Sequence, residues 1–321
     1  MADTVLVIGG AGYIGSHLCK ALAQAGYNPI TYDSLETGNL SSVRYGPFIK
    51  GNVLDLQLLI STLKTLQPTA IFHLASYTNA RASKEESQSY FTNNLLGTST
   101  LLEAINKSPV PYLLFSSSAS IYKNNPNASL KETDPLEPTS PYAQTKFSSE
   151  RLIEAFCKTH PTQYANLRYF NVAGADLEKE IGELHTPETH LIPLLIQVSQ
   201  GKKKEFVLFD TQHPTHDKTA QRDFIHVCDI AKGHIDALNF LKKHKTNLTI
   251  NLGSGTGHTI LDVLTKLQEK TGKKIQIVKA PPIQEPASLI ANIELAKKLI
   301  NWAPKHSSLD TILETALRWH S

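Results

Sequence analysis

A glycine-rich turn near the start of the chain constrains its fold most. The apolar run 5–8 leads into the stretch GGAGYIGSH (9–17), and an apolar-faced helical segment follows. Strand, tight turn and helix in this order bring unpaired helix N–H groups, and the positive end of the helix dipole, to a place where a phosphate can bind. Gly9 allows the sharp turn, Gly12 lets the backbone approach a pyrophosphate, and Gly15 lets the helix pack closely on its strand.

Asp33 strengthens this interpretation. It ends the next apolar run, and an acidic residue about 20 residues beyond such a turn is suited to bind the hydroxyls of an adenosine ribose. A glycine-rich turn alone is a weak signal, because any buried tight turn favours glycine. A carboxylate at this position would also repel a 2′-phosphate. The sequence therefore predicts NAD, rather than NADP, as the cofactor.

Apolar, strand-like runs alternate with helix-length segments through the first half of the chain. The expected strands are 5–8, 29–32, 69–74, 112–116 and 164–169, and the expected helices between them are 13–25, 54–66, 86–106 and 141–160. This alternation predicts an α/β fold with a Rossmann-type, doubly wound parallel sheet. Ligands of such sheets lie across the carboxyl ends of the strands, where the glycine turn and Asp33 fall.

The second half of the chain is less regular. Polar stretches at 176–190 and 210–221 predict loops. The expected helices are 190–200, 227–241, 259–271, 293–300 and 308–319, and the expected short strands are 205–209, 223–225, 248–252 and 274–278. We expect an NAD-binding domain over 1–176 and a smaller α+β substrate-binding lobe over 177–321, interleaved with the first domain and lying over the cofactor edge.

Composition excludes several classes of partner. The formal net charge of +3 is too small to indicate nucleic-acid binding. Three scattered cysteines predict free thiols rather than a disulfide framework. No apolar run approaches the roughly 18 residues that a membrane span needs, and no signal peptide is recognisable, so we expect a cytoplasmic protein. The loop histidines His185, His190, His213 and His216 lack a carboxylate or thiolate framework, so no metal is expected.

A second constellation carries the chemistry. Tyr142 and Lys146 are four residues apart in an expected helix and so share one face. A lysine there can stabilise the phenolate, lower the pKa of the phenol and make it a usable base near neutral pH. Ser118, at the end of a strand-like run, can hydrogen-bond the same substrate oxygen. Such a pair alone fits an ordinary surface helix, but beside a dinucleotide turn it predicts proton and hydride removal from a secondary alcohol, or the reverse.

Several motifs together resemble the extended short-chain dehydrogenase/reductase family, over nearly the whole chain. These are, in order, GGAGYIGSH (9–17), DSLETG (33–38), FSSSASIY (115–122), SPYAQTK (140–146), LRYFNVAGA (167–175) and RDFIHVCDIAKGH (222–234). The resemblance is greatest to the nucleotide-sugar 4-epimerases of that family. It implies interconversion of UDP-glucose and UDP-galactose through a transient 4-keto intermediate, with NAD as a catalyst that is not consumed. It also implies a homodimer and a place in galactose metabolism.

The resemblance further implies roles for individual residues. Tyr142 would be the acid and base, Lys146 its partner and a contact of the nicotinamide ribose, and Ser118 a helping hydroxyl. The implied cofactor contacts are Gly9, Gly12, Tyr13, Ile14, Gly15, Asp33, Asn52, Val53, Leu74, Ala75, Ser76, Thr78, Asn93, Ser116, Tyr142, Lys146 and Tyr169. The implied contacts of the UDP-sugar are Ser118, Tyr142, Asn171, His190, Leu191, Arg222 and Glu285.

The chain departs from the family pattern at four places. Asn52 stands where an aspartate usually contacts the adenine, and Thr78 replaces a lysine near the cofactor phosphates. Pro282 falls where an arginine usually binds the substrate diphosphate, while Glu285 stands for the aspartate of the same element. Leu289 lies about where these epimerases carry the residue that limits the size of the sugar's 2-substituent. Loss of the arginine would weaken diphosphate binding unless another cation replaces it.

Three alternatives therefore remain open. The chain could be a UDP-N-acetylhexosamine 4-epimerase, a nucleotide-sugar 4-ketoreductase on the same scaffold, or a catalytically idle NAD-binding sensor. A reductase would consume reduced cofactor stoichiometrically, whereas an epimerase would not. A 4,6-dehydratase is disfavoured, because the stretch 117–120 after the strand contains no acidic residue.

Overall fold

A seven-stranded sheet forms the centre of the molecule. The computed structural model describes residues 2–125, 129–209, 212–283 and 285–321. All neighbouring strands of the sheet are parallel, in the order β10-β6-β5-β4-β1-β2-β3. The strands are β1 (Thr4–Ile8), β2 (Asn28–Asp33), β3 (Phe48–Lys50), β4 (Ala70–His73), β5 (Tyr112–Ser118), β6 (Gln163–Tyr169) and β10 (Leu248–Leu252). The predicted Rossmann-type fold class is confirmed.

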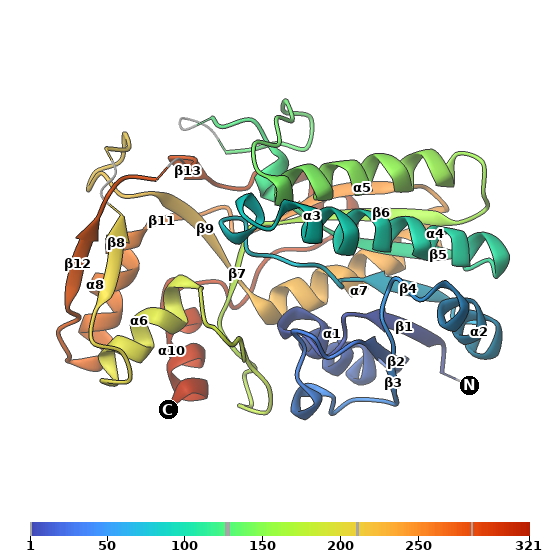
Figure 1. Ribbon diagram of the computed structural model, residues 1–321, viewed down its shortest axis with the longest axis horizontal. Helices are drawn as coiled ribbons and strands as arrows, with labels where there is room; N and C mark the ends of the chain where they lie inside the picture. The colour runs from blue at the N-terminus through green and yellow to red at the C-terminus, as the bar shows by residue number, and fades with distance from the viewer. Residues whose placement is uncertain (1, 126–128, 210–211, 284) are drawn as a thin grey trace.

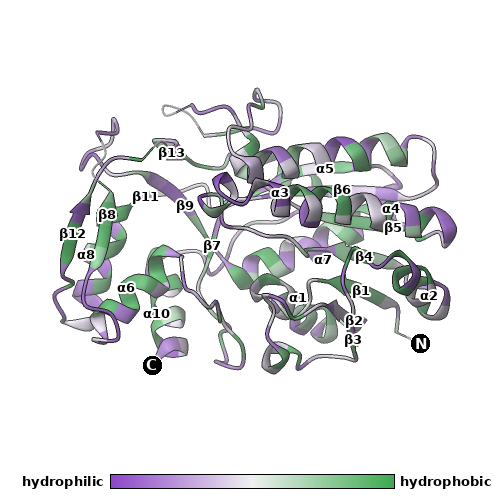
Figure 2. Cartoon of the chain, viewed as in Figure 1, coloured by the Kyte–Doolittle hydropathy of each residue, from purple (hydrophilic) through white to green (hydrophobic). Residues whose placement is uncertain are grey.

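Helices cover both faces of this sheet (Figure 1). The helices are α1 (Tyr13–Gln24) and α7 (Val227–His244) on one face, and α2 (Leu56–Leu66), α4 (Gly97–Lys107) and α5 (Pro141–Cys157) on the other. Along β1, Val5 and Val7 pack in the core with α1 and α7, whereas Leu6 and Ile8 pack against the opposite helices. Burial on both faces explains why this strand is a continuous apolar run. The helices that cover the sheet have hydrophilic and hydrophobic residues side by side (Figure 2).

Two segments of the second half belong to this large layer, as the expected interleaving of the two domains allows. β10 pairs in parallel with β6, and α7 packs on α1. Their apolar residues complete the sheet core: Ile250 and Leu252 of β10 are fully buried there. The length and hydropathy of a short apolar run identify a strand but do not say which sheet it joins. The domain boundary expected between 176 and 177 therefore stays a prediction.

The expected helix 86–106 is divided in the structure. It consists of α3 (Ser87–Tyr90), a π-helical segment η3 (Phe91–Leu96) and α4. The short strand β3 was not expected, because three half-exposed residues give no periodic signal. All three cysteines are free, as expected. Among the described residues, no helix combines the length and apolar composition that a membrane span requires.

The smaller lobe contains two small sheets and a third core. One sheet is built on β9 (Gln221–His226), which pairs with β7 (Asn171–Ala173), β11 (Gly257–Thr259) and β13 (Ser288–Leu289). The other sheet pairs β8 (Phe206–Phe209) with β12 (Ile277–Ala280). β12 lies slightly later in the chain than the expected strand 274–278. The helices of this lobe are α6 (Leu191–Ser199), α8 (Ile260–Thr271) and α10 (Leu309–His320), whereas α9 (Glu294–Ile300) packs on α7 and β10 in the core of the large sheet. Residues 210–211 of the expected loop 210–221, and Gln284, lie outside the described residues.

Candidate active site

The glycine turn joins β1 to α1 in the predicted way. Gly9 has a positive φ of 87°, and its N–H donates to the carbonyl of Tyr32 at 2.9 Å. A Cβ on Gly15 would lie 2.1 Å from the Gly9 carbonyl oxygen, so only glycine fits there. Gly12 is the N-cap of α1, and no side chain caps this helix. The N–H groups of its first turn are therefore available to an anion.

Asp33 holds the turn from the neighbouring strand. Its Oδ2 accepts the Ala11 N–H at 3.0 Å, and its Oδ1 accepts the Leu35 N–H at 2.8 Å. Burial raises the pKa of the carboxyl, while these two backbone hydrogen bonds lower it. A Cβ on Gly38 would lie 2.8 Å from Asp33 Oδ1, so glycine keeps that side of the carboxylate clear. The turn and the carboxylate thus fit a dinucleotide with a free ribose.

The loop after β4 lies against the glycine turn. The N–H groups of Leu74 and Ala75 both donate to the Ile8 carbonyl, and a Cβ on Gly9 would lie 2.5 Å from the Ala75 nitrogen. Asn94 fastens the same loop, because its side chain accepts the Tyr77 N–H at 2.8 Å and donates to Thr145 Oγ1 at 3.1 Å. Sequence reasoning missed Asn94, whose partners are distant along the chain.

The other expected cofactor residues lie along or beside this edge. Tyr13 donates to the Gly174 carbonyl at 2.5 Å, Asn93 donates to Asn94 at 3.1 Å, and Ser76 donates to the Tyr77 carbonyl at 3.1 Å. Asn52 is exposed after β3, and its side chain accepts the Leu54 N–H instead of pointing freely to a ligand. Three expected cofactor residues remain. Ile14, in the first turn of α1, is partly buried; Val53, after β3, is buried; and Thr78, after β4, is exposed.

The predicted tyrosine and lysine share one face of α5. Ser140 caps this helix by accepting the Ala143 N–H at 3.1 Å, and Pro141 occupies its first turn. The Lys146 amino nitrogen lies 5.9 Å from the centroid of the Tyr142 ring and donates to the Ser116 carbonyl at 2.8 Å. Ser118, the last residue of β5, lies close enough to the Tyr142 side chain to lower its pKa. The structure therefore brings the three expected catalytic residues together.

Burial dominates the electrostatics of this trio. Burial raises the pKa of Tyr142, and an interaction with Ser118 lowers it. Burial also lowers the pKa of Lys146 to about 7, against an opposing effect of Glu150 one turn further along α5. The effect of Lys146 on the phenolate, expected from the spacing of the two residues, stays a prediction.

Two buried polar contacts beside the trio were also missed. The hydroxyl of Tyr169 hydrogen-bonds Ser116 and the ring of His234, and burial raises its pKa beyond the usual range. Glu150 forms a bidentate ion pair with Arg168 of β6, at 3.0 and 2.8 Å, and both side chains are almost fully buried. These contacts fix α5 against β5 and β6.

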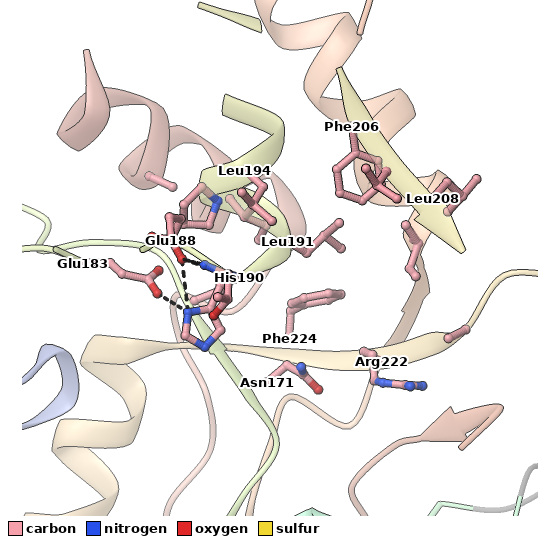
Figure 3. A pocket seen from close by; sticks show the side chains of 18 of the residues that line it. Asn171, Glu183, Glu188, His190, Leu191, Leu194, Phe206, Leu208, Arg222 and Phe224 are labelled. Carbon is pink, nitrogen blue, oxygen red and sulfur yellow. Dashed lines mark hydrogen bonds and ion pairs between the residues drawn. The ribbon is translucent and has the colours of Figure 1, made fainter. Parts of the chain in front are cut away.

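A pocket of about 500 Å³ opens next to this edge and is lined largely by the smaller lobe. It brings together five of the expected substrate residues: Asn171, His190, Leu191, Arg222 and Glu285. Figure 3 shows apolar side chains of β8 and β9, among them Phe206, Leu208 and Phe224, forming another wall. Asn79, Arg81 and Phe209 also line the pocket and were missed by sequence reasoning.

The pocket lies beside the expected catalytic residues. Asn171 follows Tyr169 by two residues, and Tyr169 stands opposite Ser118 in the β5–β6 register. On the other side, Ser83 accepts the Tyr142 N–H at 3.2 Å, in the same turn as Asn79 and Arg81. Ser118, Tyr142 and Lys146 themselves do not line the pocket, but residues close to them along the chain do.

Arg222 and Glu285 form an ion pair in the pocket. The distance between Arg222 Nη2 and Glu285 Oε2 is 3.0 Å, and both side chains are less than one-fifth exposed. Burial lowers the pKa of Arg222, Glu285 raises it, and the nearby charge of Arg81 lowers it further. Glu285, expected to contact a ribose, therefore also neutralises an arginine from a strand 63 residues earlier in the chain.

Three of the four loop histidines, His185, His190 and His216, do have carboxylate partners, contrary to the expectation. Glu183 is buried and accepts His185 Nδ1 at 2.9 Å and His190 Nδ1 at 2.6 Å, and Glu188 lies 3.4 Å from the same His190 nitrogen (Figure 3). His216 likewise lies 3.2 Å from Asp262. Burial lowers the pKa of His190, but the two carboxylates raise it overall, to about 10. The cluster fixes the start of α6 at the pocket wall.

Comparison with known proteins agrees with this arrangement. Residues 5–253 match the NAD dependent epimerase/dehydratase family. The chain is 36% identical over 320 residues to a UDP-glucose 4-epimerase of Rhizobium leguminosarum bv. trifolii, covering 99% of this chain and 98% of the relative. It superposes with a TM-score of 0.95 on a UDP-glucose 4-epimerase from Brucella ovis in complex with NAD, at 36% identity and with 99% of this chain and 98% of that chain covered.

A further structural neighbour has a wider substrate range in its name. The UDP-Glc/GlcNAc 4-epimerase of Campylobacter jejuni is 30% identical, with a TM-score of 0.84 and 99% of each chain covered. The family expected from the sequence motifs, its isomerase class and its cofactor NAD are confirmed by these matches. The chain belongs to the NAD dependent epimerase/dehydratase family.

Proposed function

We propose that this protein interconverts UDP-glucose and UDP-galactose by NAD-dependent epimerisation at C4 of the sugar. One observation carries the proposal: Ser118 ends β5 and Tyr142 begins α5 at the sheet edge that carries the glycine turn, and a pocket that contains Arg222 lies beside the turn that accepts the Tyr142 N–H. A nucleotide sugar held in the pocket by its diphosphate would present its sugar to this pair. The names of the relatives support the same activity.

The residues would divide the work as follows. Gly9, Gly12 and the start of α1 would hold the cofactor diphosphate, and Asp33 would bind the adenosine ribose. Bound NAD supplies a reversible hydride acceptor at the sugar C4. Tyr142 would take the proton of the 4-hydroxyl and later return it, while Ser118 would hydrogen-bond the same oxygen.

The rest of the constellation would orient and anchor. The Lys146 amine, fixed by the Ser116 carbonyl, would bind the nicotinamide ribose and supply positive charge beside the phenol when protonated. Arg222 would bind the substrate diphosphate, and Leu191, with the pocket's aromatic side chains, would surround the base. Anchoring at the nucleotide would let the 4-keto sugar turn over without leaving the pocket, so that the hydride can return to the opposite face.

A single variant tests the chemistry. Tyr142→Phe removes the acid and base but leaves the ring, so it should abolish conversion of UDP-glucose to UDP-galactose while NAD stays bound. Conversion is followed by the anomeric proton signals, and bound NAD is measured after denaturation. Tyr164→Phe, on the far part of β6, is the matched control and should keep wild-type turnover. An active Tyr142→Phe enzyme would contradict the proposed chemistry.

The same assay separates the alternatives. A 4-ketoreductase would oxidise reduced cofactor in proportion to product, whereas the proposed epimerase requires none to be added. An idle NAD-binding sensor would retain NAD and convert no nucleotide sugar at all. A homodimer and a cytoplasmic location also stay predictions; light scattering tests the first.

One observation favours a second substrate class. Leu289, in β13, stands opposite the pocket residue Arg222 in the β9 register and is half-buried, so the residue next to this part of the pocket is a medium-sized aliphatic one. We propose that UDP-N-acetylglucosamine is also accepted. Leu289→Tyr should then suppress turnover of the N-acetyl substrate and spare that of UDP-glucose, in the same proton assay. Equal effects on the two substrates would contradict this assignment.

A further inference from the structure

We propose that Arg81 binds the diphosphate of the nucleotide sugar together with Arg222. Arg81 would take the role of the arginine that the family usually has at the position of Pro282. This inference rests on the function proposed above. Arg81 lies in the turn after β4, far in sequence from the expected position, and lines the same pocket as Arg222 and Glu285.

The position of Arg81 spans the two lobes. Its guanidinium carbon lies 4.4 Å from the centroid of the Phe209 ring, at the end of β8 in the smaller lobe. Phe209 also lines the pocket. The guanidinium is thus held over an aromatic face, which leaves its edge N–H donors free to point toward an anion in the pocket.

The charges in this part of the pocket favour the binding of an anion. Glu285 is paired with Arg222 at 3.0 Å, whereas within the described residues Arg81 has no carboxylate at ion-pair distance. Arg81 and Arg222 are close enough for the charge of Arg81 to lower the pKa of Arg222. Two guanidinium groups, of the largely buried Arg222 and the exposed Arg81, face one carboxylate at this end of the pocket, and the pocket residues Glu183 and Glu188 lie beside His190 instead. A diphosphate would relieve this repulsion and accept hydrogen bonds from both side chains.

The turn that carries Arg81 is bonded to the catalytic helix. Asn79 Oδ1 accepts the N–H groups of Arg81 and Ala82, at 3.0 and 3.1 Å. In the same turn, the Ser83 hydroxyl donates to the Ala80 carbonyl at 2.8 Å, and its oxygen accepts the Tyr142 N–H at 3.2 Å. An anion bound by Arg81 would therefore also fix the turn against which the start of α5 rests. Arg81 would act both as a binding residue and as a positioning residue for Tyr142.

The test compares ligands with and without phosphate. Dissociation constants of UDP and of uridine are measured by isothermal titration calorimetry on the NAD-loaded enzyme. Arg81→Ala should weaken UDP binding about 10-fold or more, the value of one charge-assisted contact, and change uridine binding less than about twofold. Lys84→Ala, which removes an exposed positive charge from the same turn, is the matched control and should leave both constants unchanged. In turnover, Arg81→Ala should raise KM more than it lowers kcat.

The outcomes are separable. Unchanged UDP binding in Arg81→Ala would overturn the inference, and so would equal losses for UDP and uridine, which would place Arg81 at the base instead. Retained NAD and an unchanged circular dichroism spectrum show that the variant is folded; should it fail this check, Arg81→Gln, which keeps the side-chain length, answers the same question. If the wild-type enzyme binds UDP but epimerises no UDP-sugar, the proposed activity fails while the binding comparison still decides the role of Arg81.

Discussion

Replacing Arg168 by methionine should destabilise the protein strongly. The Arg168 guanidinium makes two hydrogen bonds to the Glu150 carboxylate, at 3.0 and 2.8 Å, and two more to the Tyr122 hydroxyl and the Glu132 carbonyl, at 2.9 and 3.1 Å. The Arg168 and Glu150 side chains are 3% and 0% exposed. Methionine fills much of the same volume but leaves the carboxylate buried without its cation.

The expected cost follows from that burial. Removing one partner of a buried ion pair costs about 3–5 kcal/mol in unfolding free energy, a large part of the 5–15 kcal/mol that is typical of whole proteins. After the change, Glu150 keeps the Ser117 hydroxyl as a donor, and Arg151 lies 3.6 Å away at the surface. The double variant Glu150→Met/Arg168→Met removes the unpaired charge as well and should recover most of the loss.

Urea unfolding, followed by circular dichroism at fixed NAD concentration, measures these differences. Arg151→Met provides the control, because Arg151 lies on the same helix, is 49% exposed and pairs with Glu154 at 2.9 Å. It should cost less than about 1 kcal/mol. Equal losses for Arg168→Met and Arg151→Met, or a double variant as unstable as the sum of the single variants, would refute the reasoning.

Three further predictions concern the glycine turn, His190 and acid stability. Gly15→Ala should lose bound NAD and stability together, because its Cβ would meet the Gly9 carbonyl at 2.1 Å; wild-type NAD content after purification would contradict this. Glu183→Gln should lower the pKa of His190 from about 10 toward its usual value, visible as an imidazole proton titration by NMR, and an unchanged titration would exclude the pair as the cause. Burial lowers the pKa values of four buried histidines to about 3 or 4, below the unfolded value near 6.5, so the unfolded chain binds more protons between those limits. The free energy of unfolding should be greatest above pH 6.5 and fall as the pH drops toward 4, by up to about 1.4 kcal/mol per pH unit for each group. The four histidines are His17, His73, His226 and His234. Equal urea midpoints at pH 7.5 and 5.5 would contradict their contribution.

The parts of the fold that sequence predicted are those with local signals. The strand, turn and helix around Gly9 follow from residues within one short segment, and the spacing of Tyr142 and Lys146 fixes their common helix face wherever the helix lies. The position of β10 could not be predicted in this way, because its partner β6 lies about 80 residues earlier and any buried parallel strand would satisfy the same apolar run.

The candidate site shows the same difference between residues with a local sequence signal and residues placed by long-range contacts. Five pocket residues were expected from motifs that resemble a family, and the structure brings them to one pocket. Arg81 was missed because an exposed arginine in a polar turn carries no pattern; only the approach of β8 shows that it faces the pocket. The effect of burial on the pKa of Tyr142 could not be predicted for a related reason. Spacing gives the neighbour of a group, but desolvation depends on everything packed around it.

The position of β10 has a consequence for how the chain folds. Until residues 248–252 are available, β6 is the edge of the large sheet. The backbone N–H and C=O groups of β6 that face β10 are then unpaired. A nascent or truncated chain that ends near residue 176 therefore exposes an apolar parallel edge, which favours association with other chains. Closure of this edge joins distant parts of the sequence, so the large sheet should reach its final stability only late in folding, after most of the smaller lobe has been synthesised.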